Sequence, residues 1–239
     1  MNETKIKKVK IYRHLFFDLD RTLWDYDKNA NEALAEILEL HGLMPVFKNV
    51  EQFWKSFEKH NDELWDLYRN GIIKKEYLRD HRFELTMNDF GTSNPELAQK
   101  LNEDFLKLSP KKTGLVDGAI DLLSYLKTKR YRMHILTNGF THIQNLKMKE
   151  SGLQNYFEHL FTSDKIGTNK PNRRMFEYAV KCVNAKKSES LMIGDDLRVD
   201  ILGAQGFGMD QVYYNPSILP HQENPTFEIS SLSELKMIL

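Results

Sequence analysis

Residues 16–25 read FFDLDRTLWD. An apolar run ends here in two aspartates one residue apart, which predicts a buried strand that delivers carboxylates to the carboxyl edge of a sheet. Two such carboxylates repel each other unless a cation lies between them. Mg²⁺ typically takes one or two carboxylates together with phosphate oxygens and water, so a divalent metal with a phosphorylated substrate accounts for Asp18 and Asp20.

The rest of the chain predicts an α/β fold with a doubly wound parallel sheet, because short apolar strands alternate with helices. The predicted strands are 14–18, 132–136, 159–162, 190–194 and 210–214. The predicted helices that alternate with them are 117–129, 140–151, 172–184, 199–205 and 231–238. Residues 28–110 show helical spacing of apolar residues and predict an inserted domain of four helices. The core domain is therefore discontinuous and comprises residues 1–27 and 111–239.

The composition of the chain argues against two classes of binding partner, nucleic acid polymers and acidic membranes. The chain has 239 residues, 41% of them hydrophobic, and equal numbers of basic and acidic residues, 34 each. No global field favours a nucleic acid polymer or an acidic membrane surface. The apolar run Leu15–Phe17 is too short for a signal peptide, so we expect a cytoplasmic protein, either a monomer or a homodimer. The single Cys182 lies in an apolar helical pattern and is expected to pack there.

Four polar segments follow predicted strands, where a doubly wound sheet collects its ligands. They are Asp18–Thr22, Ile135–Gly139, Gly167–Asn172 and Met192–Asp200. Each alone is ordinary turn or helix-start chemistry. Together and in this order they supply a nucleophile, a hydroxyl, an ammonium and metal ligands, which favours a catalytic site.

With these motifs the chain resembles the haloacid dehalogenase-like (HAD) hydrolases over essentially its whole length. The four motifs of that family match Asp18–Thr22, Thr137, Lys170 and Asp195–Asp200. The resemblance implies a Rossmann-like core and an α-helical cap at 28–110. Other segments resemble the bacterial pyrimidine 5′-nucleotidases of this superfamily, namely Leu64–Tyr68, Asn70-Gly71, Arg82–Glu84 and Ile135–Phe140.

The residue types and the resemblance together imply roles for the acids. Asp18 is the expected nucleophile, forming an aspartyl-phosphate, and it also contacts Mg²⁺. Asp195 completes the side-chain ligation, and the family pattern adds the backbone carbonyl of Asp20. The carboxyl group of Asp20 then acts as general acid and base. Asp200 orients Lys170 or a metal-bound water, and Asp196 is either a water-mediated ligand or a turn residue.

Substrate binding is expected from the second and third motifs. Lys170 balances the charge of the phosphoryl oxygens, while Thr137 and the N–H groups after it, at Asn138 and Gly139, hold those oxygens. Trp24, close to the first motif, is the expected contact to a base or sugar.

Three further side chains in the cap, Trp65, Tyr68 and Arg82, are either ligand contacts or core. His134, in a predicted buried strand, and His142, at a helix start, are interpreted as structural or exposed residues.

The expected function is hydrolysis of a small phosphorylated metabolite, most specifically a nucleoside 5′-monophosphate with a pyrimidine base. A phosphosugar phosphatase or mutase of the same superfamily shares every motif. A haloacid dehalogenase is disfavoured by Asp20, which that chemistry does not need. A non-enzymatic phosphoacceptor module is disfavoured by the helical insert and by Asp20, and the glycines at 203–208 have the wrong spacing for a dinucleotide site.

Overall fold

The computed structural model describes residues 11–47 and 49–239. The described chain separates into two compact units. Unit 1 contains the described residues up to Leu23 with Val116–Phe140 and Asn155–Leu239, and unit 2 contains Trp24–Leu115 and Thr141–Gln154. The helical domain expected at 28–110 falls within Trp24–Leu115, and unit 2 also takes in a segment from the second half of the chain.

Unit 1 is built on a sheet whose neighbouring strands are all parallel, in the order β3-β2-β1-β4-β5-β6. The strands are β1 (His14–Phe17), β2 (Arg132–Thr137), β3 (His159–Thr162), β4 (Ser190–Gly194), β5 (Asp210–Tyr214) and β6 (Phe227–Ile229). Phe16 of β1 pairs with His134 of β2 and with Met192 of β4. Every residue of β1 and β4 is buried, as expected for parallel strands covered on both faces. The predicted parallel α/β sheet is confirmed.

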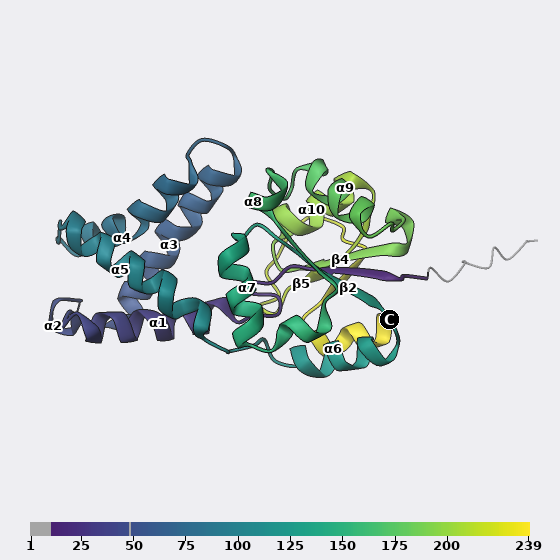
Figure 1. Cartoon of the computed structure of the whole chain (residues 1–239), viewed down its shortest axis with the longest axis horizontal. Coiled ribbons are helices and arrows are strands. Elements are labelled where there is room, and N and C mark those ends of the chain that lie inside the picture. The colour runs from purple at the N-terminus through teal and green to yellow at the C-terminus, as the bar shows by residue number, and fades with distance from the viewer. Residues whose placement is uncertain (1–10, 48) are drawn as a thin grey trace, which may run out of the picture. The chain divides into compact units, whose positions relative to one another are not determined.

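Helices cover both faces of this sheet (Figure 1). They are α6 (Ala119–Thr128), α8 (Ser163–Ile166), α9 (Arg173–Cys182), α10 (Leu202–Phe207) and α11 (Leu235–Ile238), with helical turns at Lys187–Glu189, Leu197–Ile201 and Leu232–Glu234. On one face, Phe16 and Met192 share a buried cluster with Phe176 of α9 and Phe207 of α10. On the other face, α6 and α11 contact each other.

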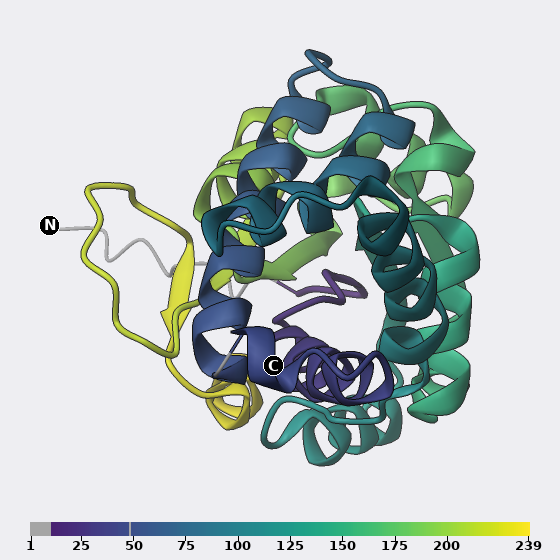
Figure 2. The ribbon, with the colours of Figure 1, turned by 90° about the vertical axis from the view of Figure 1, so that its left-hand side faces the viewer.

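The last strand, β6, was not expected from the sequence. It lies at the edge of the sheet, and the connection from β5, residues 215–226, loops out beside it (Figure 2). Of its three residues only Ile229 is buried. An edge strand this short carries too little apolar pattern to be recognised, so pairing with β5 rather than local sequence defines it.

Unit 2 is helical. Its helices are α1 (Tyr26–Leu40), α2 (Met44–Phe47), α3 (Val50–Arg69), α4 (Lys75–Asp89), α5 (Pro95–Leu108) and α7 (Thr141–Glu150), with a turn at Ser109–Lys111. A further turn forms at Leu153–Tyr156. The expected four-helix insert corresponds to α1, α3, α4 and α5. Aromatic side chains fill its core, where Phe57 lies 4.9 Å from Phe83 and 5.1 Å from Phe105 between ring centroids.

Side-chain caps define two of the helix starts. The side chain of Asn94 accepts from the N–H of Leu97 at 3.0 Å, and Pro95 opens α5. Asn172 caps α9 by accepting from the N–H of Arg174 at 3.0 Å. Local chemistry therefore sets these boundaries.

The expectation that Cys182 packs in the core is wrong, because this side chain is exposed. The buried stripe of α9 consists of Met175, Phe176, Ala179 and Val180, and Cys182 lies off that stripe at the end of the helix. Within the described part of the chain, no helix combines the length and apolar character needed to cross a membrane.

Candidate active site

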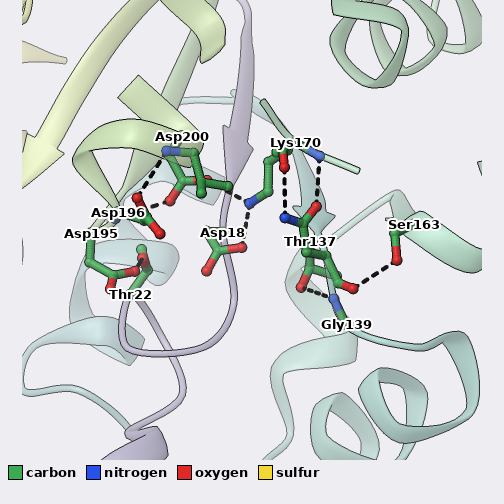
Figure 3. A network of polar contacts seen from close by, with 11 residues as sticks. Asp18, Thr22, Thr137, Gly139, Ser163, Lys170, Asp195, Asp196 and Asp200 are labelled. Carbon is green, nitrogen blue, oxygen red and sulfur yellow. Dashed lines mark hydrogen bonds and ion pairs between the residues drawn. The ribbon is translucent and has the colours of Figure 1, made fainter. Parts of the chain in front are cut away.

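The polar segments predicted from the sequence meet at the carboxyl edge of the sheet in unit 1 (Figure 3). Asp18 follows β1, Thr137 ends β2 and Asp195 follows β4. Because β1 lies between β2 and β4, the residues after these three strands are brought side by side. Lys170, from the connection between α8 and α9, reaches the same place.

Lys170 is the centre of the site. Its side chain is only 1% exposed, and its Nζ donates to Oδ1 of Asp18 at 2.5 Å and to Oδ1 of Asp200 at 2.6 Å. Burial lowers the pKa of Lys170, but the charges of Asp18 and Asp200 outweigh burial and raise it. The lysine is therefore a permanent cation that holds two carboxylates in fixed positions.

The backbone of Lys170 is held as firmly as its side chain. The amide of Asn138 donates through Nδ2 to the Lys170 carbonyl at 2.9 Å and accepts through Oδ1 from the Lys170 N–H at 2.7 Å. Ser163 in turn donates to the Asn138 carbonyl at 2.7 Å. Asn138, expected to bind substrate, thus has its side chain engaged in positioning the lysine.

Thr137 begins the turn that leaves β2. Its Oγ1 accepts from the N–H of Gly139 at 3.1 Å, and the side chain is 2% exposed. This contact closes a tight local turn, which aims the hydroxyl of Thr137 from the strand end toward the same edge as Asp18 and Lys170 (Figure 3).

Asp195 is the third acid of the site. Thr22 donates its hydroxyl to Oδ1 of Asp195 at 2.7 Å, so the first and fourth motifs are joined directly. Burial, followed by the charges of Asp18 and Asp200, raises the pKa of Asp195 well above its usual range. The Thr22 hydrogen bond opposes this rise without cancelling it.

Asp200 packs against the end of β4 with no space to spare. A Cβ atom built on Gly194 would lie 2.2 Å from Oδ2 of Asp200, so only glycine fits at that position. Burial raises the pKa of Asp200 to about 7, and Lys170 opposes the rise. Its contact with Lys170 supports the predicted role of orienting the lysine.

Asp196 has a local structural role. Its Oδ1 accepts from the N–H groups of Arg198 and Val199, both at 2.9 Å, and so caps the helical turn Leu197–Ile201. Of the two alternatives that the sequence left open, these contacts match the turn residue.

Three carboxylates, Asp18, Asp195 and Asp200, each offer an oxygen within 4.8 Å of the other two. A single ammonium, Lys170, lies among them, so negative charge is in excess in a buried place. Burial raises the pKa of Asp18 as well, with Lys170 opposing and Asp20 adding to the rise. An all-oxygen set with excess negative charge suits Mg²⁺. The structure thus groups the side chain of Asp200 with those of Asp18 and Asp195, and the expected ligation by the backbone carbonyl of Asp20 stays a prediction.

Trp24 lies in unit 2 and is fully buried. Its indole N–H donates to the Lys112 carbonyl at 3.1 Å, and the ammonium of Lys147 lies 4.2 Å from its ring centroid. A fully buried indole presents no face to a substrate in this conformation.

Arg82 is also buried, with Nε and Nη2 donating to Oδ1 of Asn102 and the Phe105 ring 4.8 Å away. It therefore belongs to the core of unit 2. Trp65 and Tyr68 contact each other on α3 at 5.7 Å between ring centroids.

Two positioning residues were missed from the sequence. Thr22 belongs to the first motif without a role of its own, and Ser163 belongs to none of the four motifs. Ser163 directly follows β3, so the rule that identified the other segments, polar residues after a strand, could also have identified it.

Comparisons with known proteins identify the family of this chain. Residues 12–208 match the family model of the haloacid dehalogenase-like hydrolases. The pyrimidine 5′-nucleotidase PynA of Streptococcus pneumoniae is 32% identical, with 94% of this chain and 93% of the relative covered. The glyceraldehyde 3-phosphate phosphatase of Methanothermobacter thermautotrophicus is 30% identical over 94% of this chain and 98% of its own length.

A solved structure extends the likeness to three dimensions. The HAD-hydrolase YfnB of Bacillus subtilis, described as bound to magnesium, superimposes with a TM-score of 0.87 at 29% identity, covering 96% of this chain and 99% of that one. The family model covers residues 12–208, and relatives at 30% identity or more cover 94% of the chain. This chain therefore belongs to the haloacid dehalogenase-like hydrolases.

Proposed function

We propose that the protein is a Mg²⁺-dependent phosphatase that hydrolyses small phosphomonoesters through an aspartyl-phosphate, with nucleoside 5′-monophosphates, above all pyrimidine nucleotides, as substrates. The observation that carries the proposal is the buried ammonium of Lys170 in contact with both Asp18 and Asp200. This arrangement presents a carboxylate beside a fixed positive charge, which is what attack on a phosphoryl group requires.

In the first step, a carboxylate oxygen of Asp18 bonds to phosphorus while the bond from phosphorus to the ester oxygen breaks. Lys170 fixes the orientation of the carboxylate and offsets the negative charge of the phosphoryl oxygens. The hydroxyl of Thr137 and the N–H groups after it hold those oxygens. Asn138 and Ser163 keep the lysine backbone in place through the contacts described above.

Asp20 is the proposed proton carrier. It donates a proton to the departing ester oxygen and later takes one from the water that attacks the phosphorus of the acyl phosphate. That second step breaks the bond to Asp18 and releases inorganic phosphate. Support comes from the charge of Asp20, which adds to the rise in the pKa of Asp18 that burial causes.

The acids present fit Mg²⁺, since they supply only oxygen ligands and leave negative charge in excess. Asp18, Asp195 and the backbone carbonyl of Asp20 would hold the ion, with Asp200 kept for Lys170. When bound, Mg²⁺ supplies positive charge opposite the phosphoryl oxygens.

The preference for nucleotides rests on the relatives. The 32% identity to a pyrimidine 5′-nucleotidase supports it. The resemblance of the segments around Trp65 and Arg82 to such enzymes points the same way. A triose or sugar phosphate is the second candidate, because a relative named as a glyceraldehyde 3-phosphate phosphatase is 30% identical.

The test is phosphate release from a panel of nucleoside monophosphates and phosphosugars, measured with Mg²⁺ or with EDTA. We expect pyrimidine monophosphates to give the highest kcat/KM, and Asp18→Asn to lower it by roughly 10³-fold or more. Asp117→Asn is the matched control, because Asp117 is an exposed acid of unit 1 outside the site. Appreciable turnover by Asp18→Asn would overturn the mechanism, and turnover of phosphosugars alone would overturn the nucleotide preference.

A further inference from the structure

A second group of metal-ligating side chains lies at the amino-terminal half of β2 and β3, away from the strand ends that form the candidate active site. His134, Glu158 and His159 each offer a ligand atom, and these atoms all lie within 4.8 Å of one another. His134 and His159 are register partners on neighbouring parallel strands, so their side chains share one face of the sheet.

His134 is the fixed member of this group. It is fully buried, and its Nε2 lies 3.2 Å from Nδ1 of His14 on β1. Its Nδ1 is buried and has no hydrogen-bond partner among the described residues. A buried polar atom without a partner is costly, and a native structure that keeps one calls for a ligand or another reason.

The contact with His14 also determines which atom of His134 can bind a ligand. A neutral imidazole carries one proton, on either Nδ1 or Nε2. When that proton lies on Nε2 it is donated to Nδ1 of His14, and Nδ1 of His134 keeps its lone pair. Metal-ligating histidines characteristically donate their other ring N–H in this way, which fixes the tautomer and the ring orientation.

His159 and Glu158 make the group accessible to an ion from solvent. Both are exposed, so an ion can reach them from solvent and their side chains can adjust around it. Glu158 is held near the group by Arg132, whose Nη2 lies 2.7 Å from Oε2 of Glu158. Arg132 Nε also donates to Oε1 of Glu158 at 3.1 Å, the longest of these contacts, so Oε1 can exchange it for an ion while Oε2 stays on Arg132.

We propose that His134, through Nδ1, together with His159 and Glu158 binds a first-row transition-metal ion, with Zn²⁺ the best match, and that His14 positions His134. Two imidazoles and one carboxylate form a donor set suited to Zn²⁺, with bonds of about 2.0–2.2 Å and a fourth position left for water. Nitrogen ligands distinguish this set from the all-oxygen acids of the active site, which suit Mg²⁺. The bound ion would tie β2 to β3 and stabilise unit 1 without entering the reaction.

The experiment is calorimetric titration of the full chain with Zn²⁺ in excess Mg²⁺, so that the acids at the carboxyl edge are saturated. His159→Ala and Glu158→Gln each remove a ligand at an exposed position, where the fold tolerates the change. We expect one Zn²⁺ to bind the unaltered chain and each variant to bind it roughly 10- to 100-fold more weakly. The rise in Tm on adding Zn²⁺ should shrink in parallel.

Two controls separate ligation from other effects. Arg132→Gln breaks the same ion pair as Glu158→Gln but keeps the carboxylate, so its Zn²⁺ affinity should stay close to that of the unaltered chain. His142→Ala removes an exposed histidine elsewhere and should change nothing. Equal Zn²⁺ affinity in the unaltered chain, His159→Ala and Glu158→Gln would overturn the proposal, as would the absence of Zn²⁺ binding. We expect none of these variants to lose phosphatase activity. The Zn²⁺ result therefore does not depend on the proposed function.

Discussion

Replacing Asp195 by Asn should raise the thermal stability of the metal-free protein while it abolishes phosphatase activity. The reason is local charge. Asp18, Asp195 and Asp200 place carboxylate oxygens within 4.8 Å of one another, and Lys170 provides one positive charge among them. Asn keeps the shape of Asp195 and can still accept the hydroxyl of Thr22 through Oδ1, so the substitution removes charge and little else.

The magnitude follows from the geometry. Two unit charges 4.8 Å apart repel by about 3.5 kcal/mol at an effective dielectric constant of about 20. Protonation limits this cost. Keeping an acid with an ordinary pKa of 3.8 neutral at pH 7 lowers the free energy of unfolding by at most about 4 kcal/mol. Because Lys170 offsets part of the repulsion, we expect a net gain of about 2 kcal/mol for the Asp195→Asn variant, which corresponds to roughly 4–8 °C in Tm.

Thermal unfolding in EDTA at several pH values tests this prediction. The pKa of Asp195 is raised in the folded protein, so its destabilising effect is absent near pH 4 and grows as pH rises toward the raised pKa. The difference in Tm between Asp195→Asn and the unaltered chain should therefore grow from pH 4 to pH 7. Added Mg²⁺ should raise the Tm of the unaltered chain more than that of the variant, because the ion binds the charged acids more tightly.

Asp196→Asn is the matched control, because it removes a charge from the adjacent residue and keeps a capping side chain at the start of the turn. Its Tm should stay the same or fall slightly. A lower Tm for Asp195→Asn than for the unaltered chain in EDTA would refute the reasoning, since it would mean that the carboxylate stabilises the metal-free fold.

Two further substitutions test packing, one in each unit. Gly194→Ala should destabilise unit 1 by about 1–3 kcal/mol and sharply lower kcat, because the new methyl group would overlap Asp200. Gly206→Ala is the control, since Gly206 has open space around it, and it should leave stability and kcat nearly unchanged. Denaturant unfolding measures the stability, and phosphate release measures kcat. In unit 2, Asn29→Ala should cost about 2–4 kcal/mol in denaturant unfolding, because the buried Asn29 amide donates to the Gly114 carbonyl at 2.8 Å and accepts from its N–H at 2.9 Å. A cost below about 1 kcal/mol would show that solvent replaces both bonds.

The parallel sheet and the main site residues could be predicted because each depends on short-range pattern. Apolar runs such as Leu191–Ile193 are buried on both faces, and parallel topology then brings whatever follows each strand to one edge. The placement of Asp18, Thr137 and Asp195 at this edge needed no other information. Strand β6 lacked such a pattern, since its pairing with β5 is a tertiary contact.

Side-chain partners at the site were harder to predict, because they depend on which polar atoms face each other across different segments. The sequence places Asn138 beside Thr137, where it resembles a substrate ligand. Its amide instead pairs with the backbone of a residue 32 positions later in the chain, Lys170. Trp24 lies close in sequence to the first motif, yet its indole is buried against Lys112, far along the chain. Residue type and strand position predicted where these polar side chains gather, but not which hydrogen-bond partners Asn138 and Trp24 take.

The concentration of acids at one sheet edge explains why so much of the surrounding structure serves to hold Lys170. The ammonium of Lys170 contacts Asp18 and Asp200 while the carboxylate of Asp195 lies nearby, so its position decides which acids are neutralised. Asn138 clamps its backbone on both sides, Ser163 fixes Asn138, and glycine at 194 lets Asp200 approach closely enough to hold the side chain. These contacts hold a charge arrangement that is unfavourable because the carboxylates repel one another. A bound cation and a phosphoryl group would reduce this repulsion. Phosphoryl transfer depends on such electrostatic stabilisation being stronger in the transition state than in the ground state.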